Sequence, residues 1–157
     1  MAAHLGLRSL YRDQQSMERA LDHLNEALAL TEALISIEDS PGLQDKLGVI
    51  LTTQGEILNS LAGHSTGQAS LQGTQTALIK QQRAVNIFRQ LEESITGPLR
   101  ELTLRRLVDS LISMSDTLEF LDLYDESQAA MQEAQEIGEK ARREDSNSPP
   151  HRNSPPH

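Results

Sequence analysis

Three side chains that could bind a metal ion stand close together near the start of the chain: Asp22, His23 and Glu26. On a helix, Asp22 and Glu26 share a face at a spacing of four residues, and His23 and Glu26 at three. A helical metal site usually needs a Glu-x-x-His or His-Glu-x-x-His element, and the chain contains neither. We therefore interpret these residues as a polar surface cluster and expect no metal ion.

Two other kinds of chemistry have little support. The glycine-rich stretch 67–73 has no Lys at its end and no strand before it, and a phosphate-binding loop needs both. A serine nucleophile elbow needs a sheet beneath it. Of the five histidines, two lie at positions 151 and 157 and one at 64, where a catalytic geometry is difficult to hold. We expect neither an enzyme nor a bound cofactor.

Composition favours helices. The 157 residues fit one domain, and 37% are hydrophobic but only 3% aromatic, with no Trp. Packing must therefore depend on Leu, Ile, Ala and Met, which suit helices better than sheets. Zero Cys excludes disulfides and thiolate metal sites and fits the cytosol. A fold of the all-α class is the expectation.

The net charge argues against two classes of partner. Fourteen Lys and Arg against 23 Asp and Glu give −9, which repels nucleic-acid phosphates and anionic membranes. Neither a signal sequence nor an apolar stretch long enough to span a membrane is evident. We expect a soluble cytoplasmic protein that binds neither nucleic acid nor membrane.

Apolar residues recur at helical spacing in six stretches. A short first helix begins near Met1, and Ser16 is expected to cap a second that runs to about Ser36. Ser40 and Pro41 should start a third, and Pro98 a fifth. The fourth helix lies between the third and Pro98, and the sixth covers about 125–144. Between the third and fourth helices, residues 63–76 are expected to form a flexible loop.

Residues 145–157 are expected to form a disordered or extended tail, because Asn-Ser-Pro-Pro-His occurs at 147–151 and again at 153–157. Ser148 and Ser154 each precede a Pro and could be phosphorylated. Low-complexity tails of this kind commonly have no such role.

Small residues recur seven positions apart on three of the expected helices: Ala20 with Ala27, Ala77 with Ala84, and Ser127 with Ala134. Seven residues are nearly two helical turns, so each pair faces the same way and lets a neighbouring helix approach closely. Threefold recurrence of one motif is typical of a stacked helical repeat.

These positions resemble the tetratricopeptide repeat family across residues 2–144. The matching positions are Leu7, Tyr11, Ala20, Leu24 and Ala27 in a first unit, Gly55, Ala77 and Ala84 in a second, and 121–127 with Ala134 in a third. The units are stretched, since 57 and 50 residues separate the second alanines where the family has 34. The family's aromatic is also missing, with His4, Leu51 and Leu111 in its place.

The resemblance implies an α-solenoid of three antiparallel helix pairs, at about 1–38, 40–95 and 98–144. A six-helix bundle of another topology remains the alternative. In the family, the first helix of each pair lines a binding groove. Carrying that pattern over gives a partner-binding set of eight residues: Arg12, Glu56, Asn59, Asp109, Ile112, Asp116, Glu119 and Phe120.

This set has no Lys, and Asn59 is its single Asn, so it lacks the combination of Lys and Asn residues with which chaperone-binding members of the family hold a C-terminal carboxylate. It is instead acidic, with Ile112 and Phe120 as apolar anchors, which suits a basic or amphipathic protein segment. In a chain of charge −9, solubility alone also explains such acidic residues. We expect a protein-binding scaffold or adaptor. The alternative is a structural bundle that self-associates through the long apolar stripe of residues 104–121.

Overall fold

The computed structural model describes residues 2–146, with side chains from Asp13 to Asp145, and this part of the chain contains five helices and no strand. The helices are α1 (Ala2–Ile37), α2 (Pro41–Gly63), α3 (Gly67–Ser94), α4 (Pro98–Phe120) and α5 (Tyr124–Ser146). The expected all-α class is therefore confirmed. Residues 147–157, most of the predicted tail, lie outside the described residues.

Local sequence signals account for the helix boundaries. Ser40 is the N-cap of α2, since its hydroxyl accepts a hydrogen bond from the Leu43 amide at 3.2 Å, and Pro41 occupies the first turn. Gly97 has a φ of 80°, which suits glycine, and directly precedes Pro98. Asp122 adopts a φ of 62° between α4 and α5. Each of these turns reverses the chain direction.

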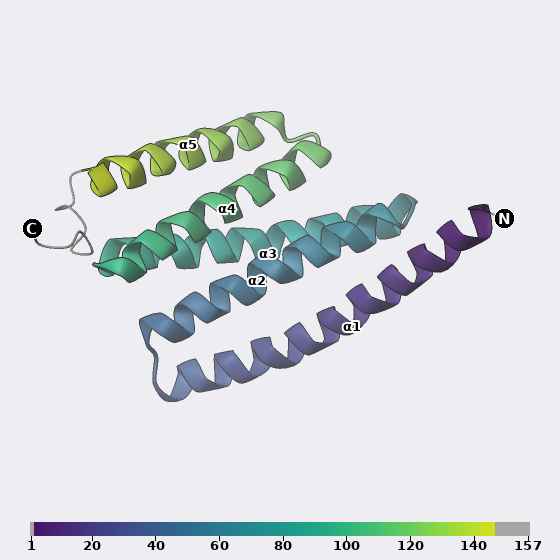
Figure 1. Cartoon of the computed structure of the whole chain (residues 1–157), viewed down its shortest axis with the longest axis horizontal. Coiled ribbons are helices and arrows are strands. Elements are labelled where there is room, and N and C mark those ends of the chain that lie inside the picture. The colour runs from purple at the N-terminus through teal and green to yellow at the C-terminus, as the bar shows by residue number, and fades with distance from the viewer. Residues whose placement is uncertain (1, 147–157) are drawn as a thin grey trace, which may run out of the picture.

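Successive helices stack side by side (Figure 1). Among the described helices, α2 packs against α1, α3 and α4, while α4 packs against α2, α3 and α5. Thus α1 and α5 form the two ends of the stack, and α3 lies against both α2 and α4. The hairpins α2–α3 and α4–α5 follow one another, with the first helix of one in contact with the first helix of the other.

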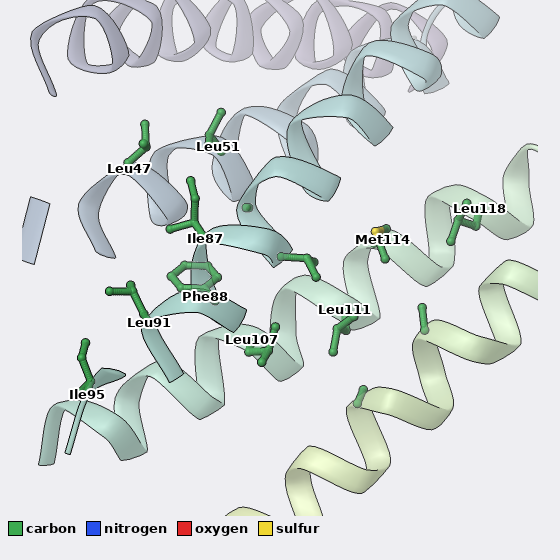
Figure 2. Packing of buried hydrophobic residues seen from close by; sticks show 14 residues of the cluster. Leu47, Leu51, Ile87, Phe88, Leu91, Ile95, Leu107, Leu111, Met114 and Leu118 are labelled. Carbon is green, nitrogen blue, oxygen red and sulfur yellow. The ribbon is translucent and has the colours of Figure 1, made fainter. Parts of the chain in front are cut away.

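The core centres on Phe88 of α3. Figure 2 shows its ring between Leu47 and Leu51 of α2 and Leu107 and Leu111 of α4. All five side chains are at least 95% buried. Leu107 and Leu111 of the α4 stripe are therefore buried within the chain, whereas Ile112 of the same stripe is 38% exposed.

Small residues let the helices approach closely. Ala77 and Ala84 are fully buried on α3, and Ser127 and Ala134 are buried on α5. On α2, Gly48 faces Phe88 so closely that an added Cβ would lie 2.5 Å from the ring atom Cζ. The seven-residue pairs thus lie at helix contacts in α3 and α5, whereas Ala20 and Ala27 of α1 are only half-buried.

The structure corrects the expected first unit. Instead of two helices with a cap at Ser16, residues 2–37 form one continuous helix of 36 residues. The physical reason is that no Gly or Pro interrupts residues 7–40, while Gln14, Gln15 and Met17 favour a helix. The described chain has one helix followed by two hairpins, so neither three pairs nor six helices are present.

The expected loop at 63–76 is also wrong over most of its length, because α3 begins at Gly67. The residues of this stretch are mostly small and polar rather than apolar, yet they form a helix. The Thr74 hydroxyl donates to the Ser70 carbonyl at 2.9 Å, and Ser70 donates to the Ala62 carbonyl of α2 at 2.9 Å. Gly73 lets the two helices approach, since a Cβ there would lie 3.2 Å from that of Ala62.

Candidate functional site

Helices α2 and α4 meet along a seam of polar contacts. The hydroxyls of Thr52 and Ser110 lie 3.0 Å apart, and Asn59 Nδ2 donates to Thr117 Oγ1 at 2.7 Å. At the other end, Arg106 pairs with Asp45. Thr52 and Asn59 are seven residues apart on α2, as are Ser110 and Thr117 on α4. The shared spacing keeps the two helices in register along the seam.

Most of the predicted partner-binding residues lie on these two helices. Glu56 and Asn59 belong to α2, whereas Asp109, Ile112, Asp116, Glu119 and Phe120 belong to α4. All except the half-buried Asn59 are exposed, including the two apolar ones, with Ile112 at 38% and Phe120 at 65%. We refer to these seven residues as the α2–α4 face. Arg12 lies in α1, among the residues whose side chains are not described.

The α2–α4 face is acidic and contains no cation. Glu56 accepts a hydrogen bond from the Ser113 hydroxyl at 3.4 Å across the seam. Asp109, Asp116 and Glu119 form no ion pair with any described residue. Their charges are therefore available to a partner, and so are the exposed apolar surfaces of Ile112 and Phe120.

Three of the predicted residues meet around one cavity. Asn59, Asp116 and Phe120 line a hollow of about 190 Å³ where the end of α2 approaches the end of α4. Gly63, Thr74 and Thr117 complete its lining. Of these, Thr74 is 97% buried and was missed because its segment was interpreted as a loop. Glu56, Asp109, Ile112 and Glu119 do not line this cavity.

Phe120 also lines a second hollow, of about 400 Å³, on the α2–α3 turn. Its other lining residues are Ser65, Thr66, Gly67, Ser70, Leu71, Leu121 and Asp122. Leu71 is 43% exposed there. Phe120 is thus an aromatic side chain common to two neighbouring hollows. In the sequence, the feature that could have indicated this second hollow is the Ser- and Gly-rich turn between α2 and α3.

That turn contains a serine in a Gly-x-Ser-x-Gly pattern, at residues 63–67. A nucleophile elbow places such a serine between a strand and a helix. Here Ser65 lies between two helices, and its hydroxyl donates to the Leu61 carbonyl at 3.3 Å. The pattern therefore has no strand below it in the described chain, and it does not build an elbow.

The strongest ion-pair cluster lies away from this face and joins α3, α4 and α5. Glu92 contacts both Lys140 at 2.7 Å and Arg100 at 2.8 Å, and Arg100 also contacts Glu144 at 3.0 Å. The hydrogen bond from Lys140, followed by that from Arg100, lowers the pKa of Glu92 below its usual range despite partial burial. This cluster ties the end of α3 to α5, and its charges are already paired.

The residues first considered for metal binding are exposed on α1. Among the described side chains, no group of three His, Cys, Asp or Glu residues is placed to hold a metal ion. Within residues 2–146, no helix combines the length and the apolar character needed to cross a membrane.

No protein-family model, no curated protein and no solved structure matches the chain.

Proposed function

We propose that the chain is a non-enzymatic protein-binding module that takes a basic or amphipathic segment of another protein on the α2–α4 face. The observation that supports this most is the convergence of Asn59, Asp116 and Phe120 on one cavity. Asn59 belongs to α2 and the other two residues to α4, so the fold itself assembles the surface.

Charge and exposure both favour such a partner. Unpaired carboxylates at Asp109, Asp116 and Glu119 attract cations and repel nucleic-acid phosphates. Ile112 and Phe120 add exposed apolar surface of the kind that anchors a bound segment. A helix with one basic and one apolar side satisfies both features.

The tetratricopeptide-like organisation is part of the proposal. Two successive hairpins whose first helices touch are compatible with two repeats of such a solenoid, with α1 stacked on the first. The proposed binding surface then lies on the first helix of each hairpin. The cytosol is the proposed compartment, because the chain contains no Cys.

The test compares two charge-reversed variants of the full chain. The first carries Glu56→Lys, Asp116→Lys and Glu119→Lys on the α2–α4 face. The matched control carries Glu18→Lys, Asp22→Lys and Glu26→Lys, which are exposed on α1 and change the net charge equally. Binding of a fluorescein-labelled amphipathic Leu/Lys peptide is measured by anisotropy, beside a Leu/Glu peptide.

We expect the unaltered chain to bind the Leu/Lys peptide and not the Leu/Glu peptide. The face variant should lose at least tenfold in affinity, about 1.4 kcal/mol, and the control much less. Equal losses in the two variants would show that net charge alone attracts the peptide, which would overturn the proposal. Absence of binding by the unaltered chain would do the same.

A further inference from the structure

The cavity at the ends of α2 and α4 offers hydrogen-bond acceptors, because the donors of its lining residues are largely engaged. The Thr117 hydroxyl donates to the Ser113 carbonyl at 3.1 Å, and the Thr74 hydroxyl donates to the Ser70 carbonyl at 2.9 Å. Asn59 Nδ2 donates to Thr117 Oγ1. Both threonine protons and one amide proton are therefore committed within the protein.

The same bonds fix the orientation of the Asn59 amide. Since the Thr117 hydroxyl gives its proton to Ser113, it can only accept from Asn59, which must present its NH₂ group. The Asn59 carbonyl oxygen is then left as an acceptor at the cavity. Asp116 adds a carboxylate that forms no ion pair with a described residue. The ring of Phe120 adds the negative face of an aromatic side chain.

The size of the cavity restricts its occupant. At about 190 Å³ it is smaller than the roughly 300–1,000 Å³ of pockets for drug-sized ligands. It has room for one long side chain. Phe120 stands exposed at the rim, where it can pack against the methylene stem of such a side chain or face its cationic head.

We propose that this cavity is a specificity pocket for one cationic side chain, an arginine or a lysine, of the bound protein segment. This rests on the proposed function and names the chemistry that one position of the partner must have. The head group binds the Asp116 carboxylate and the Asn59 carbonyl oxygen, while the stem lies against Phe120. A neutral or acidic side chain in the same place would leave Asp116 unpaired or repel it.

Single capped amino acids test the pocket without the rest of a partner. The probes are N-acetyl-arginine amide and N-acetyl-lysine amide, with N-acetyl-citrulline amide as the neutral counterpart of arginine. Each is titrated into the ¹⁵N-labelled full chain, and amide chemical shifts are followed. We expect saturable shifts centred on Asn59, Gly63 and Asp116 with a cationic probe and at least fivefold weaker binding of citrulline.

Two conservative variants then assign the contacts. Asp116→Asn should weaken binding of the cationic probes at least fivefold, and Phe120→Leu should weaken it by a smaller factor. Asp22→Asn is the matched control, because it removes the same charge from an exposed position of α1 outside both the cavity and the α2–α4 face. Comparing the arginine and lysine probes shows which head group the pocket prefers.

Failure of this inference is distinguishable from failure of the proposed function. If the Leu/Lys peptide binds the α2–α4 face but citrulline binds as well as arginine, the pocket is not cation-specific and the inference is overturned. Equal effects of Asp22→Asn and Asp116→Asn would overturn it too. If the capped cations bind at the cavity but the peptide does not, the proposed protein-binding function is overturned instead. Absence of binding by every probe overturns both.

Discussion

Replacing Gly48 with alanine tests how tightly α2 and α3 pack. An ideal Cβ at this position would lie 2.5, 2.7 and 3.0 Å from three atoms of the Phe88 ring. Carbon atoms in favourable contact are about 3.5–4.0 Å apart, so the ring would have to move by roughly 1 Å. Phe88 is 1% exposed in the centre of the core, which leaves it little space to move. We therefore expect a strained core.

The magnitude follows from a comparison with Gly138 of α5, where an added Cβ meets nothing within 4 Å. Exchanging glycine for alanine inside a helix gains about 1 kcal/mol, and this gain is common to both sites. Overpacking a core costs about 1–3 kcal/mol, and only Gly48→Ala incurs it. The free energies of unfolding of the two variants should thus differ by about 1–3 kcal/mol, with Gly138→Ala the more stable.

Urea unfolding followed by circular dichroism gives both free energies. Thermal unfolding checks them, since 1 kcal/mol corresponds to about 2–4 °C for a domain of this size. In a Phe88→Leu background the ring is absent, and the difference between the two glycine sites should shrink below about 1 kcal/mol. If Gly48→Ala is as stabilising as Gly138→Ala, the close approach of α2 and α3 is refuted.

Two further predictions concern polar contacts that hold the hairpins together. Glu92→Gln should destabilise the chain at pH 7, and the destabilisation should shrink as the pH falls. The pKa of Glu92 is lower in the folded chain than its value of about 4.3 in the unfolded chain, so its carboxylate stabilises the fold fully above that unfolded value. This stabilisation is lost as the pH drops through the folded pKa. Urea unfolding at several pH values measures this, with the exposed Glu93→Gln as control; a loss that is constant with pH contradicts it. Ser115 and Ser127 form reciprocal buried bonds, each hydroxyl reaching the other's carbonyl at 2.9–3.0 Å, so either single Ala variant should cost about 1–3 kcal/mol and the double variant less than the sum. Additive losses in such a double-mutant cycle would show that the two hydroxyls act separately.

Sequence signals predicted the starts of α2 and α4 correctly, because a specific residue type sets each boundary. Ser40 with Pro41 marks the start of α2, and Gly97 with Pro98 marks the start of α4. The apolar stripe of α4 also identified buried leucines correctly. These signals are local, so they can be recognised in the sequence without knowledge of the tertiary structure.

The two errors arise where local signals are ambiguous. Ser16 has the residue type of a cap, yet the neighbouring residues continue the helix and nothing forces a break. Between Gly63 and Thr76 the chain lacks apolar spacing, but Ser and Thr hydroxyls can bond to carbonyls of their own helix and leave it intact. Contacts with α2 determine that this stretch is helical, and those contacts depend on the tertiary structure.

The candidate site also combines features that the sequence indicates with features that depend on the tertiary structure. The groove pattern carried over from the resembling repeat family selected six residues that are exposed in the structure: Glu56, Asp109, Ile112, Asp116, Glu119 and Phe120. That Asp116 and Phe120 meet Asn59 and Thr74 around a cavity depends on the crossing of three helices. No sequence spacing encodes that crossing.

The core around Phe88 has a mechanical consequence. Its ring packs against Leu47 and Leu51 in its own hairpin and against Leu107 and Leu111 of α4 in the next hairpin. The α2–α4 seam adds neutral hydrogen bonds worth about 1 kcal/mol each, together with the ion pair of Arg106 and Asp45. Bending between the two hairpins would have to open this shared core as well as the seam, so the α2–α4 face should keep its shape when a partner binds.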